Sequence, residues 1–592
     1  MYRKMILVIV LLLFSSCSSY TGVQKQNNQA TGQLEQLFAD DWEYQLKESP
    51  LFATFYGDKR YNAALPSVSV ADNQRRLAQE KAFLTRLAEI DRNALSATHQ
   101  LNYDIFKLLK QNDIAEYQFK TYLTPITNRS GFHVSFPQLA DRVPLNSVED
   151  YENYIARLNG FEVYAQSYIE LMRAGISEGY VLPGITLKGI EGTIEPHIVK
   201  DASESLLFAA FEKFPDDIDE AAQANLTEAG KSAILNSVVP GYEAFLKFIT
   251  EEYLPAARED IAASSLPDGK AFYEHRVRLF TTLDITPKEV HKIGHSEVKR
   301  IRGEMEELIR ETGFEGSFQD FVQFLRTDDR FYVDSPKALM AQIALTLKLM
   351  DGQLPTLFKT LPRSPYGIKK IPDFIAPKTT TAYYNSPAGD GSKAGFYFVN
   401  TYDLRSRPTY EIEALSFHEA VPGHHLQIAL QQEMENIPEF RKYASFTAFV
   451  EGWALYSERL GLEVGFYEDP YSDFGRLTYE MWRALRLVVD TGMHYFGWSR
   501  QKAIDYMAEN SALTMHNITT EIDRYISWPG QALGYKMGEL KIRELRAYSK
   551  EKLGDKFDVR EFHEVVLGSG AVPMNVLEAN VTDWVSNKLS ER

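Results

Sequence analysis

The chain of 592 residues is 44% hydrophobic and 12% aromatic, and it carries a formal net charge of −17. This composition is sufficient for a large folded body, and the negative charge without any basic run argues against nucleic acid or an anionic lipid surface as a partner. Cys17 is the only cysteine, which excludes disulfides within the chain and a cysteine-based zinc site.

The first residues are typical of an exported lipoprotein. Arg3 and Lys4 precede an apolar stretch of about ten residues, which is too short to span a bilayer. We therefore expect a signal peptide over residues 1–16 and a lipid on Cys17 as the only attachment to the membrane. The absence of Asp after Cys17 resembles lipoproteins sent to the outer membrane, and so predicts a position there facing the periplasm. The alternative is an ordinary secretory signal followed by a chance cysteine.

A tether and one folded unit are expected after the cysteine. Residues 17–33 are rich in Ser, Gln, Asn and Gly and almost without large apolar side chains, so they are predicted to form a flexible tether. The rest of the chain has no internal repeat and no long linker. We expect residues 34–592 to form a single large domain.

Apolar residues at three- and four-residue steps predict a mainly α-helical body. One stripe comprises Leu34, Leu37, Phe38, Trp42 and Leu46, and a second comprises Val290, Ile293, Val298, Ile301, Met305 and Leu308. Signals for helix starts support this prediction, namely the pairs Thr286 with Pro287, Ser335 with Pro336, and Ser147 with Asp150, the last pair before a helical segment at Tyr151–Met172.

One region departs from the helical pattern. Thr379–Tyr384 and Gly395–Asn400 are short and β-branched or aromatic, and a Gly/Pro/Asp-rich segment separates them, so they predict a β-hairpin. The hairpin would lie just before the His/Glu segment described next. It serves either as a strand on which an extended substrate lies or as a purely structural element.

The segment from His418 to His425 has the residue types of a zinc hydrolase. His418 is followed directly by Glu419, but the position four residues after His418, where a second ligand usually stands, is Pro422. A proline and the glycine after it are expected to distort the helix at this point. A two-residue bulge would bring His424 into the place of the second ligand, and His425 is the alternative.

A carboxylate on a following helix should complete the metal site. Glu451 is flanked by apolar residues, where an unpaired charge is costly, and a dication would compensate that charge. Glu458, two turns further on, could orient a ligand histidine from behind. The residues themselves thus favour one Zn²⁺ ion held by His418, Glu451 and one of the two later histidines, with Glu419 as the general base.

These segments resemble a known bacterial family. The motifs HisGluAlaValProGlyHisHisLeuGln and PheValGluGlyTrpAlaLeuTyrSerGlu are similar to domain of unknown function 885, many members of which are described as lipoproteins. The resemblance extends to residues 281–287, 486–494 and 529–538 and so covers most of the mature chain.

That family is in turn similar to the helical gluzincin peptidases, such as thimet-oligopeptidase-like and carboxypeptidase-Taq-like enzymes. This likeness implies zinc bound by two His and a downstream Glu, a mostly helical zinc-peptidase-like fold with a deep channel, and short peptides rather than folded proteins as substrates. It assigns the ligand roles to His418, His424 or His425, and Glu451, and the general-base role to Glu419.

Further residues are candidates for contact with a substrate. Helical gluzincins place a tyrosine from a Gly/Tyr-rich stretch over the site, which favours Tyr535 as the donor to the oxyanion, with His494 and His516 as rivals. Arg524 and Lys536 could bind the terminal carboxylate of a substrate and would make the enzyme an exopeptidase; the alternative is that both form ordinary ion pairs.

Two rival functions remain compatible with the sequence. The protein could be a non-catalytic lipoprotein that binds peptides, although such a site has no need of a base beside its ligand, or a zinc amidase that acts on cell-wall peptides. The sequence contains no feature that predicts an oligomeric state.

Overall fold

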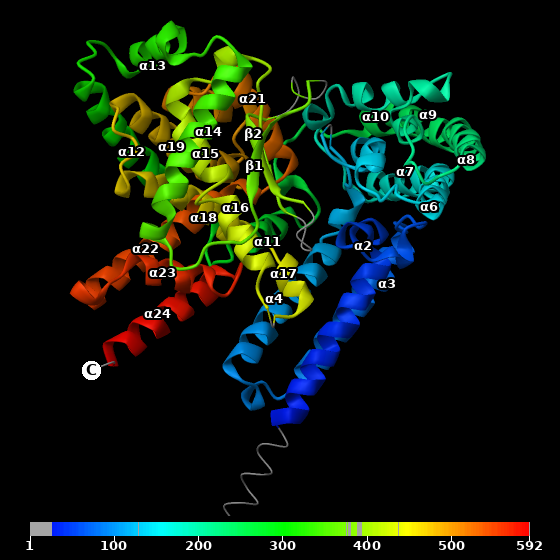
Figure 1. The fold of residues 1–592 in the computed structure, drawn as a ribbon, viewed down its shortest axis with the longest axis horizontal. Coiled ribbons are helices and arrows are strands. Elements are labelled where there is room, and N and C mark those ends of the chain that lie inside the picture. The colour runs from blue at the N-terminus through cyan, green and yellow to red at the C-terminus, as the bar shows by residue number, and fades with distance from the viewer. Residues whose placement is uncertain are drawn as a thin grey trace, which may run out of the picture. The chain divides into compact units, whose positions relative to one another are not determined.

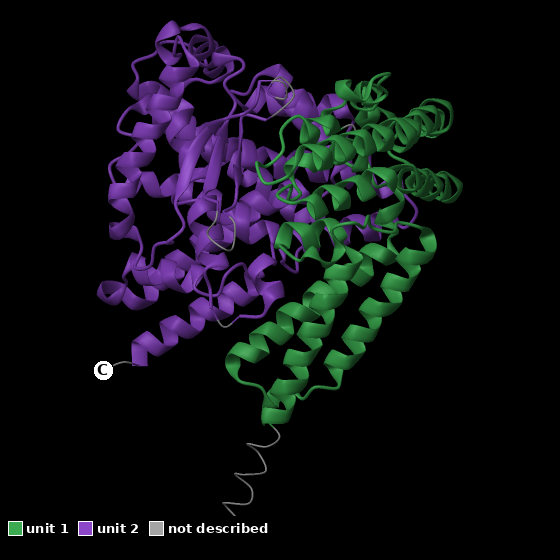
Figure 2. Cartoon of the chain, turned by 45° about the vertical axis from the view of Figure 1, so that its right-hand side comes forward, with its two compact units in different colours: residues 1–260 green, residues 261–592 purple. Residues whose placement is uncertain are grey.

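The computed structural model describes residues 27–590 except 128, 374–375, 377–379, 388–392 and 436. The chain divides into two compact units, residues 1–260 and 261–592 (Figure 2). The division differs from the single domain predicted for residues 34–592. Residues 257–262 at the joint contain no Gly, Ser or Pro, so no change in composition marks it.

The predicted signal peptide and Cys17 lie outside the described residues. Within the described part of the chain, no helix has both the length and the apolar character that crossing a bilayer requires. The predicted tether does not extend to residue 33. Residues 27–33 are helical and belong to a helix that continues to residue 48, because Ala30, which is 4% exposed, extends the apolar stripe of Leu34 and Leu37 by one turn.

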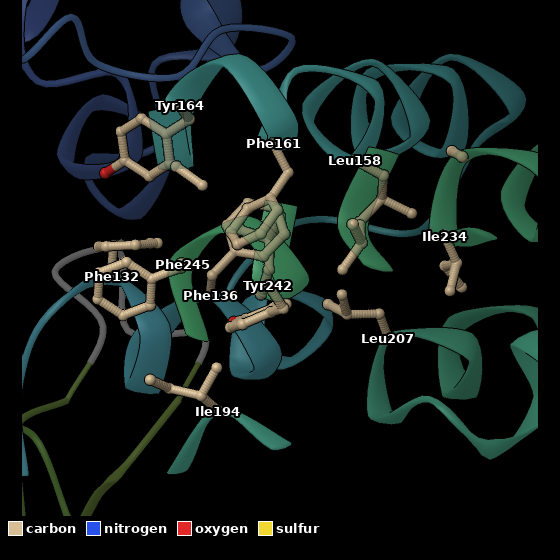
Figure 3. Packing of buried hydrophobic residues seen from close by; sticks show 14 of the residues in the cluster. Phe132, Phe136, Leu158, Phe161, Tyr164, Ile194, Leu207, Ile234, Tyr242 and Phe245 are labelled. Atoms are coloured by element: carbon tan, nitrogen blue, oxygen red, sulfur yellow. The ribbon is translucent and has the colours of Figure 1, made fainter. Parts of the chain in front are cut away.

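The first unit is built from helices around an aromatic core (Figure 3). Phe132, Phe161, Tyr242 and Phe245 lie in this core, with the rings of Phe161 and Tyr242 4.7 Å apart. The helical segment expected at Tyr151–Met172 forms two helices that meet at Gly160. The helices after residue 48 are α2 (Pro50–Tyr56), α3 (Val70–Ala88), α4 (Ala97–Gln118), α5 (Phe132–Ser135), α6 (Val148–Asn159), α7 (Phe161–Glu178), α8 (Glu220–Ala233), α9 (Val239–Phe248) and α10 (Leu254–Ala256).

The second unit combines helices with one small sheet (Figure 1). Its helices are α11 (Gly269–Thr281), α12 (Pro287–Glu311), α13 (Phe318–Thr327), α14 (Pro336–Leu357), α15 (Ile412–Glu419), α16 (His424–Gln432), α17 (Glu439–Tyr443), α18 (Thr447–Leu460), α19 (Pro470–His494), α20 (Arg500–Asn510), α21 (Met515–Ser527), α22 (Gly534–Leu553), α23 (Val559–Leu567) and α24 (Met574–Ser590).

The predicted starts of α12 and α14 are confirmed. Thr286 and Glu289 form a capping box ahead of α12, and Ser335 caps α14. The apolar stripe of α12 packs against α19. Nearly every residue of α19 after its first turn is buried, so this helix lies at the centre of the second unit.

The sheet has the strand order β1-β3-β2. β2 (Ala382–Asn385) and β3 (Gly395–Val399) pair antiparallel, which confirms the predicted hairpin, although Thr379 at its predicted start lies outside the described residues. β1 (Tyr366–Lys370) pairs parallel with β3 and was not predicted. With a glycine and two lysines, β1 has the composition of an exposed edge strand and lacks the alternation that marks a half-buried one.

Candidate metal centre

The two histidines of the HisGlu segment lie on separate helices. His418 is near the end of α15 and His424 begins α16, and residues 420–423 form the turn between them. Gly423 is required by close packing in this turn, because a Cβ atom there would stand 2.0 Å from the carbonyl oxygen of His418. The distortion expected at Pro422 and Gly423 is therefore a complete break between two helices.

Two side chains of α18 donate hydrogen bonds to this turn. The indole Nε1 of Trp453 donates to the carbonyl oxygen of Pro422 at 2.9 Å, and the hydroxyl of Ser457 donates to the same oxygen at 3.3 Å. Both residues belong to the helix that carries Glu451. The helix with the carboxylate thus fixes the turn that separates the two histidines.

The structure brings His418, His424 and Glu451 together. One potential ligand atom from each residue lies within 4.8 Å of the other two. Oε2 of Glu451 is 3.4 Å from Nε2 of His418 and 3.5 Å from Nε2 of His424, and the two imidazole rings are nearly perpendicular at 85°. This buried oxygen makes no hydrogen bond within the described residues. Two imidazoles and one carboxylate are a donor set that suits Zn²⁺.

Glu458 orients His418. Its Oε1 lies 2.8 Å from Nδ1 of His418, and both side chains are almost fully buried. When the ring is neutral, Nδ1 carries the proton and Nε2 presents its lone pair towards Glu451 and His424. Burial opposes a charge on His418, but the carboxylates of Glu451 and Glu458 outweigh it and raise the pKa of His418 to about 9.

His425 lies outside this cluster. Its Nδ1 is 2.8 Å from the hydroxyl of Tyr384 on β2, and its Nε2 is 3.1 Å from the carbonyl oxygen of Ser364. Since a carbonyl can only accept, Nε2 donates to it and Nδ1 accepts from the tyrosine, so both ring nitrogens are used. His425 therefore links α16 to the sheet.

Glu419 is buried at the end of α15, next to His418 in sequence. Burial raises the pKa of Glu419 to about 7, and the neighbouring carboxylate of Glu451 contributes in the same direction. The charge on Glu419 also helps to raise the pKa of Tyr397 on the central strand β3. The sheet therefore lies beside the carboxylate that the sequence assigns as the general base.

Tyr535, in the first turn of α22, lies close to Glu451. The helices α18 and α22 cross where Gly452 meets Gly538, and a Cβ atom on Gly538 would stand 1.8 Å from the carbonyl oxygen of Ala448. Burial and the charge on Glu451 both raise the pKa of Tyr535. The two glycines thus allow the close crossing that places a tyrosine near the cluster.

The rival donors are placed differently. Both ring nitrogens of His494 face the main chain, with Nδ1 accepting from the amide of Ala263 at 3.0 Å and Nε2 lying 3.0 Å from the carbonyl oxygen of Tyr525. His516 is exposed in the first turn of α21.

Lys536 does not fit its predicted contact with a substrate. Its side chain has no exposed surface, and its ammonium lies 2.8 Å from both Glu480 and Glu539 and 3.1 Å from Glu297. An ammonium surrounded by three carboxylates is a structural cation, which favours the alternative that Lys536 forms ion pairs within the protein. Arg524 remains near Tyr535, but it donates to Glu521 and, at 2.8 Å, to Oε1 of Gln531.

The charged residues of α19 near the site were missed in the sequence. Asp490 accepts from the amide of Gly530, and Arg483 lies 3.6 Å from Glu458. Burial alone would raise the pKa of Glu451, but the two histidines outweigh this effect and lower the pKa to about 2. Arg486 is among the other charges that lower it. The available signal was a series of charged residues at three- and four-residue steps within a long helix: Arg476, Glu480, Arg483, Arg486 and Asp490.

The fold and the site thus define a mainly helical protein with a largely buried His/His/Glu cluster. Residues 50–581 match the family model described as "Bacterial protein of unknown function (DUF885)", and the chain belongs to this family.

Solved structures support this assignment. A "putative lipoprotein" from Colwellia psychrerythraea is 32% identical, with 94% of this chain and 99% of that chain covered and a TM-score of 0.89. A "putative lipoprotein of unknown function" from Shewanella oneidensis is 18% identical, with 92% and 98% covered and a TM-score of 0.71, and shares the fold. No curated protein matches the sequence.

Proposed function

We propose that this protein is a zinc-dependent hydrolase that cleaves peptide bonds in short peptides. The observation that carries the proposal is Oε2 of Glu451, a buried carboxylate oxygen without a hydrogen bond that faces one nitrogen each of His418 and His424. A carboxylate oxygen and two imidazole nitrogens that converge in this way are a ligand set for a dication, which all three side chains would bind.

Each side chain then has a defined task. His418, His424 and Glu451 hold the ion, and Glu458 fixes the orientation of His418. Zinc, when bound, makes water a nucleophile near neutral pH and polarises the carbonyl group of the substrate.

Glu419 is the general base in this proposal. Its carboxylate follows a ligand directly in the chain and is buried beside the cluster, where it can take a proton from the water nucleophile and pass it to the leaving amine. Tyr535 is the donor that stabilises the oxyanion, because the charge on Glu451 acts on its hydroxyl and the raised pKa keeps this hydroxyl a donor over a wide pH range.

The substrate class rests on the resemblance to helical gluzincin peptidases. A deep channel, as in those enzymes, would admit extended peptides and exclude folded proteins. The small sheet beside Glu419 has β1 and β2 as its edge strands, along which a peptide could lie.

The decisive experiment pairs metal content with turnover. Glu419→Gln should keep one zinc per chain and lose peptide hydrolysis by about 10²–10⁴-fold, the usual contribution of a general base. Glu413→Gln, on the same helix but bonded to the amide of Tyr467, is the matched control and should retain turnover. Full activity of Glu419→Gln, or no cleavage of a mixed peptide library by the zinc-loaded protein, would contradict the proposal. Cleavage confined to muropeptides would identify a cell-wall amidase instead.

We further propose that the protein is a lipoprotein of the outer membrane whose body faces the periplasm. The apolar stretch before Cys17 and the descriptions of the two structural neighbours support the lipid anchor, and the absence of Asp after Cys17 supports the outer membrane. Replacing Cys17 by Ala should move the protein from the membrane fraction to the soluble periplasmic fraction. Membrane association that persists in this variant would contradict the lipid anchor.

A further inference from the structure

Arg486 of α19 is a buried cation whose hydrogen-bonding capacity is only partly used. Its side chain is 5% exposed. Nε donates to the hydroxyl of Tyr525 at 2.7 Å, and Nη2 lies 3.3 Å from Oε2 of Glu521. Nη1 is closed off from solvent and has no hydrogen-bond partner among the described residues. A buried donor of a charged group is costly to leave unpaired, so this arrangement points to an acceptor that is supplied from outside the chain.

The surrounding charges also favour an anion. Arg486 and Arg524 share a single carboxylate, that of Glu521. The other hydrogen bonds of these two arginines go to neutral groups, the hydroxyl of Tyr525 and the amide oxygen of Gln531. This group of three charged side chains therefore carries one surplus positive charge in a buried setting, where an uncompensated charge destabilises the fold.

Arg486 lies next to the candidate metal centre. Its guanidinium carbon is 4.3 Å from the ring centroid of Tyr535 and 4.6 Å from that of Trp482. Its positive charge acts on Glu451, and in the proposed metal-bound protein that carboxylate would be a ligand of the ion.

We propose that Nη1 of Arg486 receives the C-terminal carboxylate of the peptide substrate, which makes the protein an exopeptidase that acts from the C-terminal end. This inference rests on the proposed peptide hydrolysis and deepens it. A carboxylate accepts a short, charge-assisted hydrogen bond from a guanidinium and supplies the negative charge that the group lacks. Low exposure strengthens this interaction, because water does not screen it.

Arg524 is the matched comparison. It carries the same charge, and it shares Glu521 with Arg486. Its Nη1, however, donates to Gln531, and its Nε and Nη2 face Glu521. The geometry thus assigns the substrate contact to Arg486 and a supporting role to Arg524, in place of the pair Arg524 and Lys536 suggested by the sequence.

The test uses three peptides of one sequence: a free acid, the corresponding C-terminal amide, and an amide whose last residue is glutamate. Binding is measured by calorimetry on the zinc-loaded Glu419→Gln protein, in which hydrolysis does not interfere. We expect the free acid to bind about 10- to 100-fold more tightly than either amide, the range of a hydrogen bond to a charged group. In the double variant with Arg486→Gln this ratio should fall to about one, and in the double variant with Arg524→Gln it should persist.

Several results would overturn the inference. Equal binding of the acid and the amide by the Glu419→Gln protein, in which Arg486 is intact, would contradict the inference. This result does not depend on whether Arg486→Gln folds. Equal loss of the ratio in both arginine variants would show a general effect of charge, and tight binding of the glutamate amide would show that a side-chain carboxylate suffices.

The proposed hydrolysis is tested separately by cleavage of the same peptides with the wild-type protein. Equal cleavage of the acid and the amide rejects the role of Arg486 and leaves the hydrolase. Selective binding of the acid without any cleavage rejects the hydrolase and leaves the role of Arg486.

Discussion

Replacing Glu458 by Gln tests how the second carboxylate of α18 supports the metal site. Oε1 of Glu458 lies 2.8 Å from Nδ1 of His418, with both groups nearly inaccessible to solvent. Hydrogen bonds to a charged group contribute about 1.5–3 kcal/mol and neutral ones about 0.5–1.5 kcal/mol. Gln keeps the size and one acceptor oxygen but loses the charge. The expected cost is about 1–1.5 kcal/mol, or roughly tenfold in zinc affinity, at the lower end of the range usual for such supporting residues.

The pH at which affinity is measured matters for this variant. Glu458 also helps to raise the pKa of His418 to about 9, so a proton competes with the ion at neutral pH. Loss of the carboxylate relieves part of that competition below pH 9. The difference in zinc affinity between wild type and Glu458→Gln should therefore increase as the pH rises from 7 to 9.

Competition against a chelator of known affinity provides the assay. Glu463→Gln is the matched control, because Glu463 lies just after α18 and pairs with Arg546 rather than with a histidine. An unchanged zinc affinity in Glu458→Gln, or an equal loss in both variants, would refute the reasoning.

Three further substitutions test the structure around the site. Gly538→Ala places a methyl group against the main chain of α18 and should lower the free energy of unfolding, measured by chemical denaturation, by about 3 kcal/mol or more. The control Gly303→Ala, at a helical position with open space around it, should raise the free energy of unfolding by about 0.5–1 kcal/mol. Equal effects of the two substitutions would contradict the close crossing. Trp453→Phe removes the buried hydrogen bond to Pro422 and should lower the free energy of unfolding by about 1–3 kcal/mol and weaken zinc binding. Unaltered stability and unaltered zinc affinity would show that Trp453 does not fix the turn. Burial raises the pKa of Asp490 to about 7, so the protonated carboxyl group stabilises the folded state and this stabilisation decreases by up to about 1.4 kcal/mol per pH unit as the pH rises from about 4 to 7. The melting temperature of Asp490→Asn should therefore rise relative to that of wild type over this interval. A constant difference between the two melting temperatures would contradict the pKa shift.

The helical class of the fold was predictable because each helix encodes its own signals. The stripe from Leu34 to Leu46 is buried except at Trp42, which is half-buried, and the caps at Thr286 and Ser335 are where the sequence predicts them. Local periodicity and capping do not depend on the rest of the fold. The edge strand β1 and the division at residue 260 depend on distant contacts, and no short-range pattern marks either of them.

The grouping of His418, His424 and Glu451 was predictable because a helix breaker stands between the histidines and an apolar context surrounds the glutamate. The choice between His424 and His425 was less accessible to the sequence, since it depends on Tyr384, a residue of a distant strand that binds His425. The ion pairs of Lys536 were only partly accessible to the sequence. Glu539 is three residues further along the same helix, but Glu297 and Glu480 come from α12 and α19, and only packing brings them to Lys536.

X-ray diffraction from crystals grown with zinc, recorded on both sides of the zinc absorption edge, tests the central claim most directly. The account predicts one strong anomalous peak per chain, about 2.0–2.2 Å from Nε2 of His418, Nε2 of His424 and a carboxylate oxygen of Glu451. A peak at His425, or a map without a peak between these three side chains, would contradict it.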